Sequence, residues 1–553
     1  MTVTEAPRDV QDAAAVDIEP ASPTGLAALV GSGDPRAIGN LFVGTSLLFL
    51  LVTAVTGLLV GFEQVDVEKA DNILSSDTLS QVVTLHSISG LFLVVLPLLL
   101  GIATAVVPLQ IGASTVAFPR ASAAGYWSFL VGGGLLLASY ALNGGPFGGD
   151  ADGVALFIVA FVLVLVALCV ATVSVVTTVV ALRAPGMTLR RTPLFSWSML
   201  VAGSIWLLTL PVLAGILVLS YVDLTWGTGF MGGANGLYSR IMWVFWQPTL
   251  YAFAIPALGI IADIVPVFAQ RRHQRHAVAM FAIGLFGALS FGAWANVAVT
   301  GLFDEIDPQP TPWLYKGPWV AVSFIIVVPL LALLGLWALT LTTGKVRLGS
   351  PLLFALVAGT LLLVGVAGGV GTAIDQLDVD GTTWMTAQSY AVLLAALTAG
   401  FGALAYWGPK LYGRTLSEAS TRLTATLLLA GTVVLVVPYA IAGLLDQPRL
   451  LDFNLDAIDG DVSTIETLNT VSAIGGVIVV LGLLLGILGV VGALIGRKGT
   501  SPGDDPWAGH TLEWATSSPP PVGNFASLPE ITSEAPLYDA RHAALRTTTE
   551  ASA

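Results

Sequence analysis

The 553-residue chain is 55% hydrophobic and only 10% charged, whereas soluble domains carry about 25% charged residues, so a polytopic membrane protein remains after ordinary soluble folds are excluded. Fibrous and disordered classes are excluded too, because the 60 glycines and 30 prolines form no short repeat and the apolar fraction is high. The net charge of −13 argues against nucleic acid as a partner, since phosphate binding requires clustered lysine and arginine.

The chain is predicted to begin with a polar cytoplasmic tail at residues 1–33. This stretch mixes Ala, Asp, Pro and Ser without the apolar core of a signal peptide, so we expect the first hydrophobic span to be retained. A membrane domain is predicted for 34–498, and a second cytoplasmic tail for 499–553.

Hydrophobic runs long enough to cross a hydrocarbon core of roughly 30 Å recur along the membrane domain. Barrel strands would appear as short alternating segments, so the runs predict helices and an all-α fold. We expect twelve membrane-spanning helices, at 39–61, 82–107, 125–145, 154–182, 197–221, 241–269, 277–302, 318–343, 350–374, 385–408, 423–445 and 470–496.

The loops between these predicted helices alternate in charge. One set is basic, as in Arg271, Arg272 and Arg275, and the other is acid-rich, as in 375–380. The positive-inside rule places the basic loops, and with them both termini, in the cytoplasm. The acidic outer face is a candidate docking surface for a basic partner, and a solvated surface is the alternative interpretation.

The second predicted helix contains the only histidine within a hydrophobic span, His86. Sequence motifs surround it and recur along the chain, namely LHSISG at 85–90, VPLQIGA at 107–113, AFPR at 117–120, FWQPTLY at 245–251, WAN at 294–296, YWGPKLYGR at 406–414 and TLEWATSSPPP at 511–521. In order and spacing they resemble subunit I of the heme-copper terminal oxidases, and the last is typical of bacterial members. The resemblance covers about 34–530 and implies the family's twelve-helix arrangement.

The resemblance also implies where metal ligands should lie, and most of those positions are substituted. In that family, six histidines hold a low-spin heme, a high-spin heme and a copper ion. Here the copper-ligand positions are occupied by Gln247, Asn296 and Val297, and the high-spin heme position by Gln388. An amide oxygen is a poor ligand for Cu(I) and valine has no lone pair, so copper is not expected.

The resemblance still leaves open the binding of one heme. The resemblance gives His86 the position of a low-spin heme ligand, Tyr390 the opposite axial position and Arg449 a propionate contact. A phenolate can ligate ferric iron, whereas a neutral tyrosine coordinates weakly. The alternative for His86 is a histidine hydrogen-bonded within the helix bundle, although ionisable groups in a membrane are functional by default.

Asp263 and the His273–His276 pair are weaker indicators of function. Asp263, at the cytoplasmic end of the sixth span, is interpreted either as a point of proton uptake or as a helix-end carboxylate near water. The two histidines lie beside arginines that would repel a divalent ion, so we interpret their loop as a topology signal.

Three functions follow. The leading interpretation is a noncatalytic or modified subunit I-like component of a respiratory complex in the bacterial inner membrane. Its expected partners are oxidase subunit II-like and III-like membrane subunits, with cytochrome c as a candidate at the acidic outer face. The resemblance implies cytochrome-c oxidase activity with proton translocation, and the chain could take part in it only through its partner subunits.

Two alternatives stay open. One is a single-heme electron-transfer subunit that uses His86. The other is a transporter or channel with a polar interior, and the side chains that would line it are Gln247, Asn296, Gln388, Ser389 and Tyr390.

Overall fold

The computed structural model describes residues 25, 30–66, 73–231, 237–293, 312–449, 462–495 and 502–551. Within these ranges the chain is helical, with one isolated antiparallel bridge between Thr382 and Pro448 and no strand. The predicted all-α fold is therefore confirmed for the described part of the chain.

The membrane helices follow one another along the chain. In chain order they are α2 (Pro35–Glu63), α3 (Ser76–Ile88), the π-helical η1 (Ser89–Val95), α4 (Leu96–Ile111), α5 (Pro119–Ala141), α6 (Ala151–Ala181), α7 (Leu194–Trp226), α8 (Leu237–Phe268), α9 (His276–Leu289), α11 (Pro312–Ile325), α12 (Val327–Thr343), α13 (Ser350–Thr372), α14 (Thr383–Tyr412), α15 (Glu418–Gly443) and α16 (Val462–Leu494). The C-terminal segment then forms the short helix η6 (Leu512–Ala515) and α17 (Pro536–Ala551).

Eleven helical stretches among the described residues are long and apolar enough to cross a membrane, which makes this a multi-pass membrane protein. They correspond to eleven of the twelve predicted spans, with α3, η1 and α4 forming the second and α11 with α12 the eighth. The span predicted at 277–302 begins as the 14-residue α9, and its part from 294 onward lies outside the described residues.

Several helices extend beyond the apolar runs that predicted them. The helix expected at 197–221 continues to Trp226, past Asp223, because a helix need not end where the hydrocarbon core ends. The helix expected at 125–145 instead occupies Pro119–Ala141. It begins at a proline, which is favoured in the first helical turn, and it ends before Asn143, whose φ of 53° is not helical.

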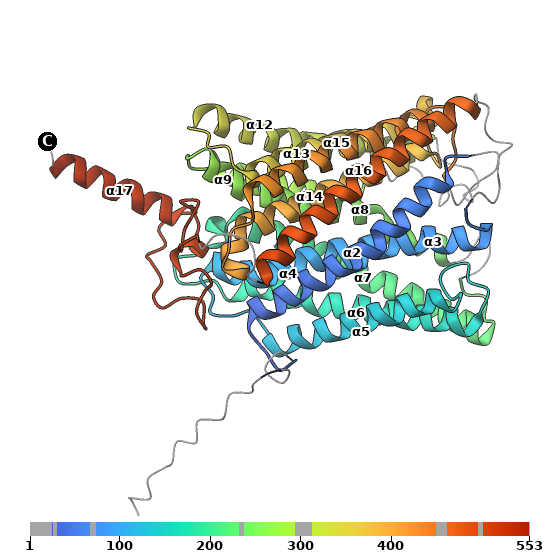
Figure 1. The fold of residues 1–553 in the computed structure, drawn as a ribbon, viewed down its shortest axis with the longest axis horizontal. Coiled ribbons are helices and arrows are strands. Elements are labelled where there is room, and N and C mark those ends of the chain that lie inside the picture. Colours follow the sequence, from blue (N-terminus) through green and yellow to red (C-terminus); the bar gives the residue numbers. More distant parts are fainter. Residues whose placement is uncertain are drawn as a thin grey trace, which may run out of the picture.

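The spans lie side by side in one bundle (Figure 1). The most buried are α8, α14 and the second span, with at least 89% of their apolar windows inside the protein, compared with 33% for α7 and α16. The central position of α14 brings it into contact with α4, α8, α13 and α15. Any site built on α14 is therefore enclosed by neighbouring helices.

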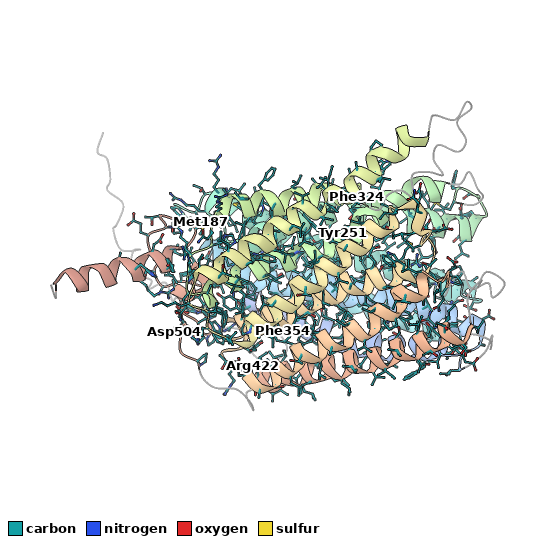
Figure 2. The ribbon with its side chains drawn as sticks, turned by 90° about the horizontal axis from the view of Figure 1, so that it is seen from above. Met187, Tyr251, Phe324, Phe354, Arg422 and Asp504 are labelled. Carbon is teal, nitrogen blue, oxygen red and sulfur yellow. The ribbon has the colours of Figure 1, made fainter. Side chains whose placement is uncertain are left out.

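The C-terminal segment docks at one end of this bundle, where α17 projects away from it (Figure 1). Arg272 forms an ion pair with Glu534 at 2.7 Å, and Arg191 donates to the carbonyl oxygen of Ile531 at 3.1 Å. Figure 2 shows Asp504, which belongs to this segment, at the same end as Arg422. Basic loops that were predicted to share one membrane face thus lie together with the C-terminal segment.

Candidate functional site

His86 lies in the last turn of α3, immediately before η1. Its Nδ1 atom is 2.9 Å from the carbonyl oxygen of Thr53 and 3.4 Å from the hydroxyl of Thr56, both on α2. A carbonyl oxygen can only accept, so we assign the proton to Nδ1. The Nε2 atom of the neutral ring is then left as an acceptor, and Nε2 is the atom that faces α14.

Tyr390 of α14 forms a hydrogen bond with this Nε2 atom. Its hydroxyl oxygen lies 3.0 Å from Nε2 of His86, so the Tyr390 hydroxyl donates to the ring. A metal–imidazole bond is about 2.0 Å long, so two axial ligand atoms on opposite sides of an iron lie about 4 Å apart. The direct contact is 3.0 Å. Coordination of one iron by both His86 and Tyr390 would therefore require the two side chains to move about 1 Å apart.

Gly57 of α2 supports the position of the imidazole. A Cβ atom at residue 57 would lie 2.6 Å from Cε1 of His86, so only glycine leaves room for the ring in this place. The His86 side chain is therefore held between α2 on one side and Tyr390 on the other.

Further polar side chains continue from Tyr390 toward the ends of α2 and α16 that lie away from the C-terminal segment. The Tyr390 ring stacks on the ring of Tyr439 with centroids 6.5 Å apart. The hydroxyl of Tyr439 donates to the side-chain oxygen of Gln64, and Asn469 donates to the backbone oxygen of Gln64 at 2.8 Å. These contacts join α2, α14, α15 and α16 through polar groups that lie inside the bundle.

Gln388, two residues before Tyr390 in α14, is also bonded to protein. Its Nε2 atom donates to the hydroxyl of Tyr251 on α8 at 3.2 Å, and both side chains are buried. Gly369 of α13 lies against this pair, since a Cβ there would be 2.7 Å from Nε2 of Gln388 and would overlap the Tyr251 hydroxyl. Figure 2 places Tyr251 within the bundle. The position that the resemblance assigns to a high-spin heme ligand thus links two helices directly.

The side chains at the predicted copper-ligand positions are not among those that the structure describes. Gln247 lies in α8 but its side chain is not among the described ones, and Asn296 and Val297 belong to 294–311. In the described part of the chain, no group of three or more His, Cys, Asp or Glu side chains could hold a metal ion.

Arg449, the predicted propionate contact, is half-buried in the loop after α15. Its backbone N–H donates to the carbonyl oxygen of Gly381 at 2.9 Å. Burial raises the pKa of the nearby Asp380, and the positive charge of Arg449 opposes that shift. The charge of Arg449 thus acts on a protein carboxyl group in the same loop region.

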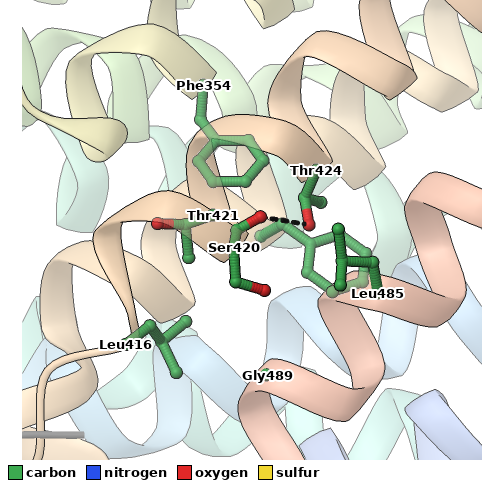
Figure 3. Close-up of a pocket in the computed structure, with 9 residues that line it drawn as sticks. Phe354, Leu416, Ser420, Thr421, Thr424, Leu485 and Gly489 are labelled. Carbon is green, nitrogen blue, oxygen red and sulfur yellow. Dashed lines mark hydrogen bonds between the residues drawn. The ribbon is translucent and has the colours of Figure 1, made fainter.

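A pocket between α13, α14, α15 and α16 is lined by apolar and hydroxyl side chains such as Phe354, Thr421 and Leu485 (Figure 3). Its volume is about 220 Å³ including space open to solvent, which is below the roughly 300–1,000 Å³ of small-molecule sites. None of its lining residues titrates near neutral pH, so the pocket offers no acid, base or ligand for chemistry.

The chain matches the model of the family "Cytochrome C and Quinol oxidase polypeptide I" over residues 37–478. It belongs to that oxidase polypeptide I family. It is similar to cytochrome c oxidase subunit 1 of Bacillus subtilis, with 30% identity covering 94% of this chain and 84% of the relative. It is also similar to a putative cytochrome c oxidase subunit 1-beta of Streptomyces avermitilis, with 32% identity covering 92% and 91%.

A solved heme-copper terminal oxidase dimer shares the fold, with a TM-score of 0.70 and 15% identity over 84% of this chain and 85% of that one. A further relative, from Aeropyrum pernix, is named as a heme-copper oxidase subunit I+III and is 30% identical over 90% of this chain and 61% of its own length. The resemblance is thus confirmed, and the chain is a cytochrome c oxidase subunit I-like membrane subunit.

In this oxidase-family chain, the partners of the predicted site residues were not foreseen from the sequence. Thr53 and Gly57 carry no motif, yet they hold the imidazole of His86. Gln110 lies in the VPLQIGA stretch and Glu513 in the TLEWATSSPPP stretch, and the structure brings them together at 3.3 Å. The presence of polar residues within these two motifs was the signal that could have drawn attention to them.

Proposed function

We propose that this chain is a noncatalytic subunit I-like component of a bacterial inner-membrane respiratory complex, without a heme-copper oxygen-reducing centre. The observation that carries the proposal is the 3.0 Å hydrogen bond between Tyr390 and Nε2 of His86, since Nε2 is the atom a heme iron would need. The bond from Gln388 to Tyr251 supports it at the second heme position.

The role proposed for such a subunit is to hold the complex together. The described transmembrane surface exposes large apolar side chains such as Leu208, Phe281 and Leu488, which suit lipid or other membrane subunits. We propose subunit II-like and III-like partners in the membrane, cytoplasmic tails at 1–33 and 499–553, and cytochrome c as a candidate partner at the acidic outer face. The last rests on charge complementarity alone.

The deciding experiment measures heme by the pyridine hemochrome assay, and copper by elemental analysis, on the complex purified from its native membrane. We expect heme and copper per chain to equal the background of a matched His86→Ala preparation. A heme absorption that disappears in His86→Ala, without copper, would instead establish the single-heme electron-transfer function. Two hemes with copper would overturn the proposal, and dioxygen reduction would then be the function to test.

Tyr390→Phe provides a test of the hydrogen bond itself. Loss of the hydroxyl leaves Nε2 of His86 buried without a donor, so we expect a loss of stability of about 1–3 kcal/mol and no change in the visible spectrum. The measurement is thermal unfolding of the purified protein. Tyr221→Phe is the control, because its hydroxyl forms no hydrogen bond with any residue that the structure describes, and its effect should stay within about 0.5 kcal/mol. Equal melting temperatures for the two variants would contradict the assignment.

A further inference from the structure

A second polar cluster lies where the C-terminal segment meets the ends of the membrane helices. It consists of Gln110 near the end of α4, Asp263 near the end of α8 and Glu513 in η6. Nε2 of Gln110 donates to Oδ2 of Asp263 at 2.8 Å and to Oε1 of Glu513 at 3.3 Å. The hydroxyl of Ser196 donates to Oε1 of Gln110 at 2.6 Å, which fixes the orientation of the amide. The amide nitrogen of Gln110 therefore donates hydrogen bonds to the carboxyl groups of both Asp263 and Glu513.

The two carboxyl groups have different surroundings. Asp263 accepts from the backbone N–H groups of Leu194 at 3.0 Å and Phe195 at 3.2 Å, the first residues of α7, where the helix dipole favours negative charge. Glu513 is fully buried, and its Oε1 accepts from Gln110 and from Nε1 of Trp407 at 3.1 Å. The Thr511 hydroxyl lies near the carboxyl group and favours its charged form, but Oε2 is buried and forms no hydrogen bond of normal length and angle with any described residue. Asp263 thus has the better environment for an ionised carboxylate.

The positive groups near Glu513 form their hydrogen bonds and ion pairs with other partners, although the Lys410 ammonium is close enough to attract a Glu513 carboxylate. Nζ of Lys410 on α14 donates to the backbone oxygens of Asp504, Thr516 and Ser517 at 3.0, 2.6 and 3.3 Å. Arg541 of α17 forms its ion pair with Asp505 at 2.9 Å. Among the described residues, no cation forms an ion pair with the Glu513 carboxyl group.

The remaining titratable groups around the cluster are mostly acidic. They are Asp263 on α8, Tyr406 on α14, Asp504 and Asp505 in the segment before η6, and His510 before α17. Burial lowers the pKa of His510 to about 3, so this side chain is neutral near pH 7. A buried carboxylate that lacks a cation is costly, whereas a neutral carboxylic acid with one unpaired hydroxyl costs much less.

We propose that Gln110, Asp263 and Glu513 form a proton-binding site, in which Glu513 is a neutral carboxylic acid with its proton on Oε2 and Asp263 carries the negative charge. Binding and release are a simple exchange with water: the Glu513 carboxylic acid loses H⁺ and becomes a carboxylate. The second negative charge then lies beside Asp263 in a buried place, which weakens the docking of η6 against α4 and α14. The site therefore couples proton occupancy to docking of the C-terminal segment.

The direction of the pH dependence follows from the same groups. Burial raises the pKa of Glu513 above its ordinary value of 4.5 when the segment is docked. Docking therefore binds a proton, and the docked state is most stable below pH 4.5, the ordinary pKa of the carboxyl group. The equilibrium constant for docking falls by up to tenfold per pH unit as the pH rises from 4.5 to the raised pKa of the docked state. Above that pKa the constant does not change further.

The proton itself is tested by infrared spectroscopy on the full-length protein in lipid nanodiscs near pH 7. We expect a C=O stretching band of a protonated carboxylic acid in the wild type that is missing in Glu513→Gln and present in Asp505→Asn. Asp505 is the matched control, because it lies on the same segment and its carboxylate is paired with Arg541. A spectrum of Glu513→Gln identical to that of the wild type in this region overturns the proposal.

Docking is tested by hydrogen exchange of residues 503–516, corrected for the intrinsic pH dependence of exchange, from about pH 5 to pH 9. We expect wild-type protection to fall as pH rises and that of Glu513→Gln to stay constant. Asp505→Asn should keep the wild-type slope at a lower level. Protection in the wild type that does not change with pH overturns the coupling, and this outcome can be read even where the Glu513 variant fails to accumulate. Neither readout depends on heme or copper content.

Discussion

Replacing Lys410 with methionine is expected to destabilise the protein by about 3–5 kcal/mol and to detach the segment that follows α16. Only 1% of Lys410 is exposed, and its three N–H groups bind three backbone oxygens of that segment. The ammonium also lies 5.1 Å from the centroid of the Trp514 ring. Methionine resembles the aliphatic part of the lysine side chain but leaves the three carbonyl oxygens without their charged donor.

The expected loss is measured as thermal unfolding, together with the rate of proteolysis within 502–525. Lys345→Met is the matched control, since Lys345 is an exposed lysine in the loop after α12 at the same end of the bundle. Its effect should stay within about 0.5 kcal/mol. If both variants melt and are cleaved like the wild type, Lys410 does not hold the C-terminal segment.

Gly475→Ala is expected to destabilise the protein by about 1–3 kcal/mol or more, even though alanine is the better helix former. A Cβ atom at residue 475 of α16 would lie 2.6 Å from the carbonyl carbon of Val434 and would overlap the backbone nitrogen of Leu435. Both contacts are with the backbone of α15, so no side-chain rotation can relieve them. The helices must move apart, and the bond from Ser472 to the oxygen of Leu435 at 3.1 Å would be strained.

The neighbouring Gly476 gives the control for this experiment. A Cβ atom there meets nothing within 4 Å, so Gly476→Ala should stabilise α16 by up to about 1 kcal/mol through helix propensity. The two variants should therefore shift the melting temperature in opposite directions when measured in the same detergent. A shift of the same sign in both would mean that α15 and α16 do not approach closely at Gly475.

The sequence by itself determined the class of protein and most of its helices. Lipid offers no hydrogen bonds to the backbone, so each span must be a long apolar helix, and such runs can be read directly from the residues. His86 could be singled out for the same reason, since a histidine is costly within an apolar span. The substitutions at Gln388 and Val297 were likewise visible without coordinates, because a ligand depends on residue type.

Only the tertiary structure decided which side chains meet. Tyr390 and His86 are 304 positions apart and Gln110 and Glu513 are 403 apart, so their contacts depend on how α14 and the C-terminal segment pack. The proton on Nδ1 of His86 is assigned from a carbonyl oxygen of α2. The lack of a normal hydrogen bond at Oε2 of Glu513 among the described residues depends on how η6 packs against the bundle. Hydrogen bonding and burial between distant segments are set by three-dimensional packing, and neither local propensity nor hydrophobic periodicity encodes them.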